Sequence, residues 1–153
     1  MKARKIAGLD PTAPLKPNAR RIVATRLEEL HSLAEEALVP DAAEAQHDMR
    51  IAVKRLRYAL EIFGSCLGEP AEPARLAAKQ LQSALGDLHD CDVIMPRVEA
   101  IPSPADAIRE RREHLFRAFA KLWRDEAIQG RLGGFEQSPL AVDARHVVPV
   151  EFP

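Results

Sequence analysis

The stretch QHDMRIAVKRLRYALEIF, residues 46–63, decides the fold class of this chain. Apolar residues recur in it at intervals of three and four, which is the spacing of one face of an α-helix. That face comprises Met49, Ala52, Val53, Leu56, Leu60 and Phe63. Because Gly64, Gly68 and Pro70 follow, the pattern predicts a helix over residues 43–67 with this face buried.

The opposite side of the same predicted helix carries a row of positive charge. At about 100° per residue, the row lies within roughly 80° of the helix circumference and comprises His47, Arg50, Lys54, Arg57 and Glu61. Like charges at this spacing cost about a few tenths of a kcal/mol each, and only Glu61 relieves them. Arg suits bidentate phosphate contacts and Lys adds a point charge, so the row predicts an anion site. A solvated face with basic chains lying over the bundle explains this helix equally well when it is taken alone.

The next predicted helix repeats the polar spacing. Lys79, Gln82, Gly86 and His89 are separated by three, four and three residues, as are His47, Arg50, Lys54 and Arg57. A glycine inside a helix costs about 1 kcal/mol relative to alanine, and a ligand or another helix approaching closely would explain it. For Gly86 alone, helix packing is a sufficient explanation. Two such stripes on consecutive helices are expected to face each other across a groove.

Helical periodicity and breakers also define the rest of the chain. Besides residues 43–67, helices are expected over residues 18–38 (capped by Asn18), 73–89 with an extension to 98 that Pro96 kinks or ends, and 104–129. Short connections between four helices predict an all-α, antiparallel four-helix bundle. The expected organisation is an extended Pro-rich arm (1–17), a helical domain (18–130) and an irregular tail (131–153).

Composition limits the classes of function. The chain has 153 residues, 46% hydrophobic and 5% aromatic, with a formal net charge of -1. Neutral overall charge and few aromatics disfavour nucleic-acid binding. Two cysteines without a spaced framework indicate reduced thiols, and no segment has the features of a signal peptide or a membrane helix. We therefore expect a cytoplasmic protein with no membrane association.

Catalytic and metal chemistry find little support in the residue pattern. His47 and Asp48 are adjacent, as are His89, Asp90, Cys91 and Asp92, so neither group gives the i,i+4 pair of a helical zinc site. None of the candidate nucleophiles Ser65, Ser83 and Cys91 has an evident general base. We expect no metal, no cofactor and no enzymatic activity.

The remaining charged clusters are interpreted as structural. Asp87 is expected to pair with a basic residue of the stripes, and Asp90 and Asp92 to organise a kink before Pro96. The cations of the last helix are interspersed with acids and are expected to form a solvated face; they are Arg109, Arg111, Arg112, Arg117, Lys121 and Arg124.

Two segments carry a family resemblance. Residues 46–63 resemble the signature helix of the conserved histidine α-helical domain (CHAD), and LQSALGDLHDCDVIMPRV, residues 81–98, resembles its companion helix. Weaker similarity covers residues 10–30 and 114–125, so the resemblance spans most of residues 9–130. It implies a helical bundle whose basic cavities bind inorganic polyphosphate without catalysis. Carried over by position, the ligand contacts are His47, Arg50, Lys54, Arg57, Lys79, Gln82 and His89, with Arg55 at the rim.

The chain departs from the family pattern in one respect. Typical members contain two four-helix repeats related by an approximate twofold axis, and this chain contains one. The departure predicts a homodimer in which two copies share a basic channel; a monomer with half a site is the alternative. Association with polyphosphate or storage granules fits the same ligand. Other functions left open are an accessory subunit of a triphosphate- or polyphosphate-processing enzyme, a nucleic-acid binder and a structural, self-assembling helical bundle.

Overall fold

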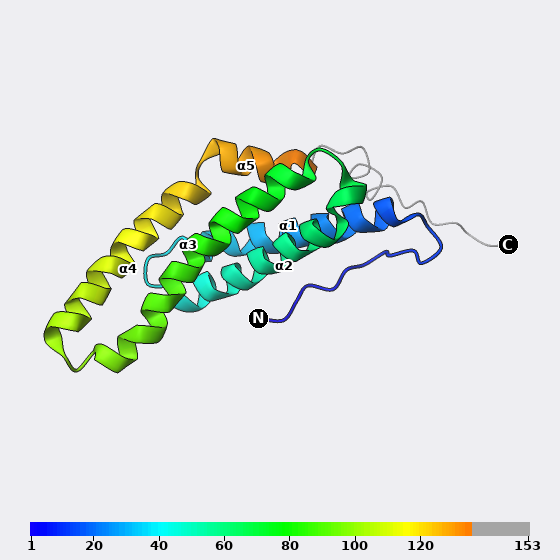
Figure 1. The fold of residues 1–153 in the computed structure, drawn as a ribbon. Coiled ribbons are helices and arrows are strands. Elements are labelled where there is room, and N and C mark those ends of the chain that lie inside the picture. The colour runs from blue at the N-terminus through cyan, green and yellow to red at the C-terminus, as the bar shows by residue number, and fades with distance from the viewer. Residues whose placement is uncertain (136–153) are drawn as a thin grey trace.

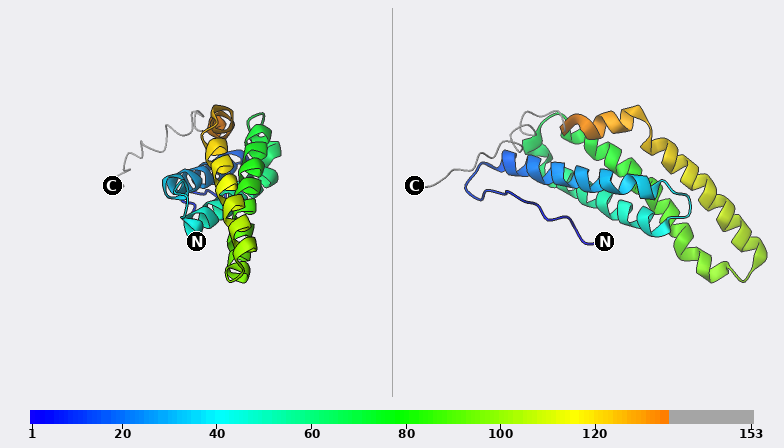
Figure 2. Two further views of the ribbon diagram at one scale, coloured as in Figure 1. Left: turned by 90° about the vertical axis from the view of Figure 1, so that its left-hand side faces the viewer. Right: turned by 180° about the vertical axis from the view of Figure 1, so that it is seen from behind.

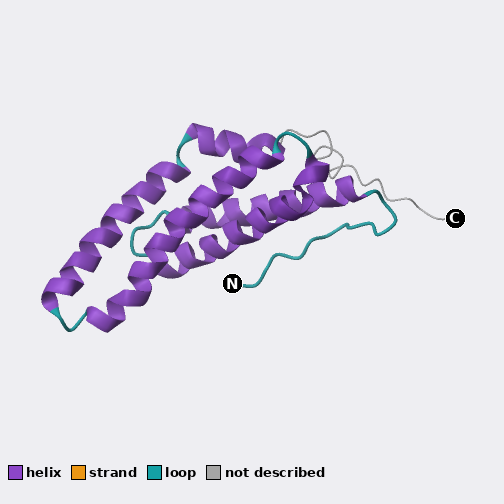
Figure 3. Cartoon of the chain, in the orientation of Figure 1, coloured by secondary structure: helices purple, strands orange, loops and turns teal. Residues whose placement is uncertain are grey.

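The computed structural model describes residues 1–135, and all regular structure in that range is helical (Figures 1 and 3). The elements are α1 (Leu15–Ala37), α2 (Ala43–Leu67), α3 (Ala71–Val98), α4 (Pro102–Trp123), α5 (Glu126–Leu132) and a 3-10 turn, η1 (Gly133–Phe135). The predicted all-α class is confirmed. No helix in residues 1–135 is both long enough and apolar enough to cross a membrane.

Consecutive helices pack side by side in up-and-down order. α2 lies between α1 and α3, α4 packs on α3, and α5 folds back along α3. The hairpin formed by the end of α3 and the start of α4 extends beyond the α1–α2 pair (Figure 2). This arrangement leaves one side of the α2–α3 pair outside the core.

The core contains the faces that the apolar spacing predicts. In α2, Met49, Ala52, Val53 and Leu56 are fully buried and Leu60 is nearly so. Leu81, Leu85 and Leu88 of α3 and Phe119 of α4 complete the layer. Burying a large aliphatic or aromatic side chain stabilises the fold by about 1.5–3 kcal/mol, so these residues fix which face of each helix remains for a site.

The first helix begins earlier than its predicted start at residue 18. α1 starts at Leu15 and includes Pro17, which a helix tolerates in its first turn. Asn18 is not a cap: its side chain donates to the Asp10 carbonyl at 2.6 Å and accepts from the Asp10 amide at 3.0 Å. Asn18 therefore anchors the preceding extended arm to α1.

Pro96 does not end α3, which remains helical as far as Val98. Asp92, which was expected to organise a kink before Pro96, pairs through its carboxylate with Arg112 of α4 at 2.5 Å. A contact with a residue far along the chain therefore determines the role of Asp92.

The predicted helix over residues 104–129 is two helices. α4 begins at Pro102 and ends at Trp123, and the Asp125 side chain caps α5 by accepting from the Ala127 amide at 2.8 Å. Leu132 and Phe135 are buried, so the packed domain extends past the boundary predicted at residue 130. The rest of the predicted tail, residues 136–153, lies outside the described residues.

Candidate functional site

The two polar stripes meet along the seam between α2 and α3. The imidazole rings of His47 and His89 have their centroids 4.7 Å apart. Further along, Arg57 Nε donates to Gln82 Oε1 at 2.8 Å. Since α2 and α3 are antiparallel, these contacts run in opposite order along the two helices, and the stripes form one continuous polar seam.

Gly86 gives Arg50 room to lie against α3. A Cβ built at Gly86 would sit 3.7 Å from Arg50 Nε, at ordinary van der Waals distance. A larger side chain at this position would meet the guanidinium. The group that lies nearest to Gly86 is therefore a cation of the neighbouring helix, at a distance that would also accommodate an alanine.

Two nitrogens in this part of the seam are buried without a hydrogen-bond partner in residues 1–135: His47 Nδ1 and Arg50 Nε. An unsatisfied buried polar group costs about 1–3 kcal/mol, and more when it is charged. Arg50 also forms no ion pair within the described chain. This end of the seam therefore holds a cation whose charge the described residues do not neutralise.

Arg57 lies at the other end of the seam, where charge is compensated. It forms a close ion pair with Glu61, and Glu61 also lies 3.8 Å from Arg75 of α3. Arg75 was missed as a site residue although it lies one helical turn before Lys79, in line with the α3 stripe. Its pairing with Glu72 at 2.6 Å partly neutralises its charge.

Lys54 and Lys79 are exposed, one on each helix of the seam. Neither forms an ion pair with a described residue. Tyr58, also missed from sequence, has its ring 5.8 Å from Lys54 Nζ and 4.6 Å from the Arg57 guanidinium carbon. Cations over an aromatic face are attracted by its quadrupole, so Tyr58 holds both basic chains beside the seam.

Arg55 is not a rim contact of this seam. Its guanidinium faces α1, where it pairs with Glu29 at 3.0 Å and donates to the Met1 carbonyl at 3.2 Å. Glu29 is 1% exposed and also pairs with Arg26 at 2.7 Å. Arg55 therefore compensates a buried carboxylate on the side of α2 that is turned toward α1.

In the part of the chain that the structure describes, the fold brings together neither a metal site nor an activated thiol. Within residues 1–135, no group of three or more His, Cys, Asp or Glu side chains could hold a metal ion. Burial raises the pKa of the Cys91 thiol, outweighing the opposing effect of Arg111. A thiol with a raised pKa is a weaker nucleophile at neutral pH.

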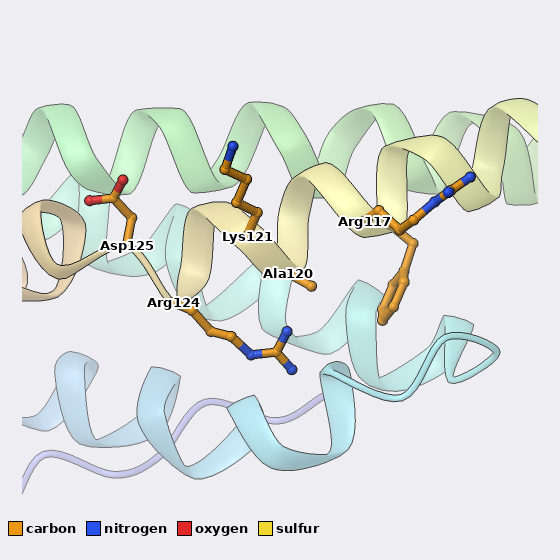
Figure 4. A pocket seen from close by; sticks show the side chains of 6 residues that line it. Arg117, Ala120, Lys121, Arg124 and Asp125 are labelled. Atoms are coloured by element: carbon orange, nitrogen blue, oxygen red, sulfur yellow. The ribbon is translucent and has the colours of Figure 1, made fainter.

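A shallow depression of about 550 Å³ lies elsewhere, beside α4 (Figure 4). Its lining residues are Phe116, Arg117, Ala120, Lys121, Arg124 and Asp125. Arg117 lies 3.5 Å from Glu113, one turn earlier on the same exposed face. Within residues 1–135, no side-chain nitrogen or oxygen of α4 is both buried and without a hydrogen-bond partner, which distinguishes this helix from the seam with its buried Arg50 Nε.

One known protein family matches this chain. The CHAD domain family model matches residues 2–99, more than half of the 153-residue chain. The matched region contains the whole of α1, α2 and α3, and with them both stripes. No curated protein and no solved structure matches the chain. With both of its signature helices inside the matched region and packed against each other, the chain belongs to the CHAD domain family.

Proposed function

We propose that this protein binds inorganic polyphosphate, without catalysis, along the α2–α3 seam. The family is linked in general to polyphosphate and triphosphate, and the seam has the residue types that such a ligand requires. Arg supplies paired donors to phosphate oxygens, Lys a compact charge, and His a donor whose charge depends on pH. A linear polyanion can contact all of these along a single path.

One observation carries the proposal: Arg50, Lys54 and Lys79 line the seam with no carboxylate partner among the described residues. Arg50 is set apart from the exposed cations of the chain because its Nε is buried and has no hydrogen-bond partner in residues 1–135. A buried, unpartnered guanidinium nitrogen costs free energy that an external anion would recover, and the exposed Lys54 and Lys79 add positive charge along the same seam. Charge-assisted hydrogen bonds to phosphate are about twice as strong as neutral ones.

The proposed ligand is expected to bind weakly at the end of the seam where positive charge is already compensated. Arg57 is fixed by Gln82 and Glu61, so it is preorganised but already partly neutralised. A phosphate reaching Arg57 would have to compete with the Glu61 carboxylate. We therefore expect the ligand to bind most strongly between His47 and Lys54, with Arg57 contributing less.

A second copy of the chain is the proposed partner. The outer face of α2 exposes Tyr58 (44%) and Ile62 (70%) beside Lys54. Tyr58 and Ile62 are one helical turn apart, so they form a contiguous apolar surface of the kind that a protein contact covers. A twofold contact through this face would bring two seams together. Light scattering should give a dimer mass, Ile62→Glu should convert it to a monomer, and a monomeric wild type at all concentrations would contradict the dimer.

The polyphosphate proposal is tested by a charge reversal with a matched control. Arg50→Glu with Arg57→Glu should lower polyphosphate affinity by about 100-fold, because losing buried charged contacts costs several kcal/mol. Arg109→Glu with Arg117→Glu reverses the same charge on α4 and should have little effect. If the seam variant unfolds, Lys54→Gln with Lys79→Gln, at two exposed positions, provides the same comparison.

A competition measurement tests ligand class. Long-chain polyphosphate should displace a labelled polyphosphate probe far better than single-stranded RNA of equal charge, because Tyr58 offers one exposed ring beside the seam whereas RNA binding uses several rings on which successive bases stack. Equal displacement by the RNA would overturn the assignment to polyphosphate. Equal loss of affinity in the seam and α4 variants would show that binding follows net charge rather than the seam.

A further inference from the structure

Arg112 of α4 connects three parts of the chain at one end of the seam. Its Nε pairs with Asp92 Oδ1 of α3 at 2.5 Å. Its two terminal nitrogens donate to the Pro40 carbonyl at 2.7 Å and to Gln46 Oε1 of α2 at 2.8 Å. The guanidinium thus joins α3, the α1–α2 connection and the first turn of α2.

Gln46 is the α2 partner in this cluster and is only 2% exposed. Its amide nitrogen donates to the Val39 carbonyl at 2.8 Å and the Pro40 carbonyl at 3.2 Å, while its oxygen accepts from Arg112. No side chain caps the start of α2. The position of its first turn therefore depends on Gln46 and on the guanidinium that Gln46 accepts from.

Both anchors of Arg112 lie next to the histidine pair. Gln46 immediately precedes His47, and Asp92 lies three residues, about one turn, after His89. The two helices that carry the rings are thus connected by one cation at the same end of the seam. Arg112 itself lies outside residues 2–99, the range of the family match.

We propose that Arg112 is a positioning residue, which sets the spacing of His47 and His89 and through it the strength of polyphosphate binding. The part concerning affinity rests on the function proposed above. Without the guanidinium, Asp92 loses its ion pair and Gln46 Oε1 loses its donor, so the start of α2 can shift against α3. Since the rings are 4.7 Å apart, a small shift changes their contact.

The test combines a spectroscopic and a binding readout. In Arg112→Gln, the imidazole NMR signals of His47 and His89, assigned by single His→Gln variants, should move in the ligand-free protein. Polyphosphate affinity should fall by about tenfold, the equivalent of one lost charged hydrogen bond. Arg109→Gln, on the same helix but paired within residues 1–135 with Asp106 alone, should move neither signal nor affinity.

A charge exchange distinguishes positioning from general stability. Arg112→Asp with Asp92→Arg restores the ion pair in reverse and should return the imidazole signals part of the way toward those of the wild type. Arg112→Lys retains the charge and should give an intermediate effect, and it replaces Arg112→Gln if that variant does not fold. A lowered melting temperature with unchanged imidazole signals and affinity would overturn the inference. If the wild type fails to bind polyphosphate, the proposed function fails, and the imidazole signals still decide the positioning role.

Discussion

The rings of His47 and His89 lie 4.7 Å apart and are inclined by 37°, one on α2 and the other on α3. They are 42 positions apart in the chain (89 minus 47) and become neighbours because α2 and α3 pack antiparallel. Their contact defines one point of the register between the two stripes. Arg50 with Gly86 and Arg57 with Gln82 follow from the same register.

Gly86→Ala should raise stability and weaken ligand binding only slightly. Alanine is favoured over glycine inside a helix by about 1 kcal/mol, and the added Cβ would meet Arg50 Nε at 3.7 Å, an unstrained distance. Gly86→Leu should instead displace Arg50 and sharply reduce polyphosphate affinity. Thermal unfolding and titration with polyphosphate measure the two effects. The control is Gly130→Ala, where no atom lies within 4 Å; identical binding by Gly86→Leu and wild type would exclude Arg50 from the site.

Lys54→Gln and Lys79→Gln should each reduce the salt dependence of polyphosphate binding. By analogy with nucleic acids, each phosphate neutralised adds about 0.7–0.9 to the slope of log affinity against log salt. Both lysines are exposed, so folding should be unaffected. Affinity measured over a range of salt concentrations gives the slope. A slope that is unchanged in the double variant would mean that these lysines do not contact the ligand.

Glu29→Gln should destabilise the protein most at neutral pH. Burial by itself raises the pKa of Glu29, but the Arg4 amide and the Arg26 and Arg55 guanidinium groups outweigh it, so the pKa lies below the ordinary value of 4.5. A carboxyl whose pKa is lowered by folding contributes stability above its unfolded pKa and loses that contribution as pH falls through the folded value.

Urea unfolding at several pH values measures this contribution. Removing one partner from a buried ion pair costs about 3–5 kcal/mol, so the difference between wild type and Glu29→Gln should be large near neutrality. It should shrink as pH falls below about 4.5, the ordinary Glu value. Glu28→Gln, on an exposed neighbour, is the control. A difference that does not change with pH would mean that the variant acts through packing rather than charge.

Asp125→Ala should destabilise α5 without affecting the seam. The Asp125 carboxylate accepts from the Ala127 and Ile128 amides at the start of this helix. Losing an N-cap costs about 0.5–2 kcal/mol, and α5 contributes the buried side chains of Ile128 and Leu132 to the core. The melting temperature should fall, Asp125→Asn should retain most of the stability, and polyphosphate affinity should be unchanged. Loss of affinity in Asp125→Ala would link the site to α5.

Periodicity and charge spacing along the chain were enough to predict the helical class, the buried face of α2 and both stripes. These properties are local: a helix places residues three and four apart on the same face whatever surrounds it. The apolar face that includes Met49 and Leu56 therefore could be assigned to the core, and His47, Arg50 and Lys54 to the opposite side, without knowledge of the neighbouring helices.

Only the tertiary structure decided which charges were already paired. Arg55 belongs to the same basic run as Lys54, but the packing of α1 turns it to Glu29. Arg112 was expected on a solvated face, but the packing of α4 on α3 brings it to Asp92 and Gln46. Such pairings depend on the register between helices, which is set by how side chains interdigitate at each seam and not by the periodicity of any one helix.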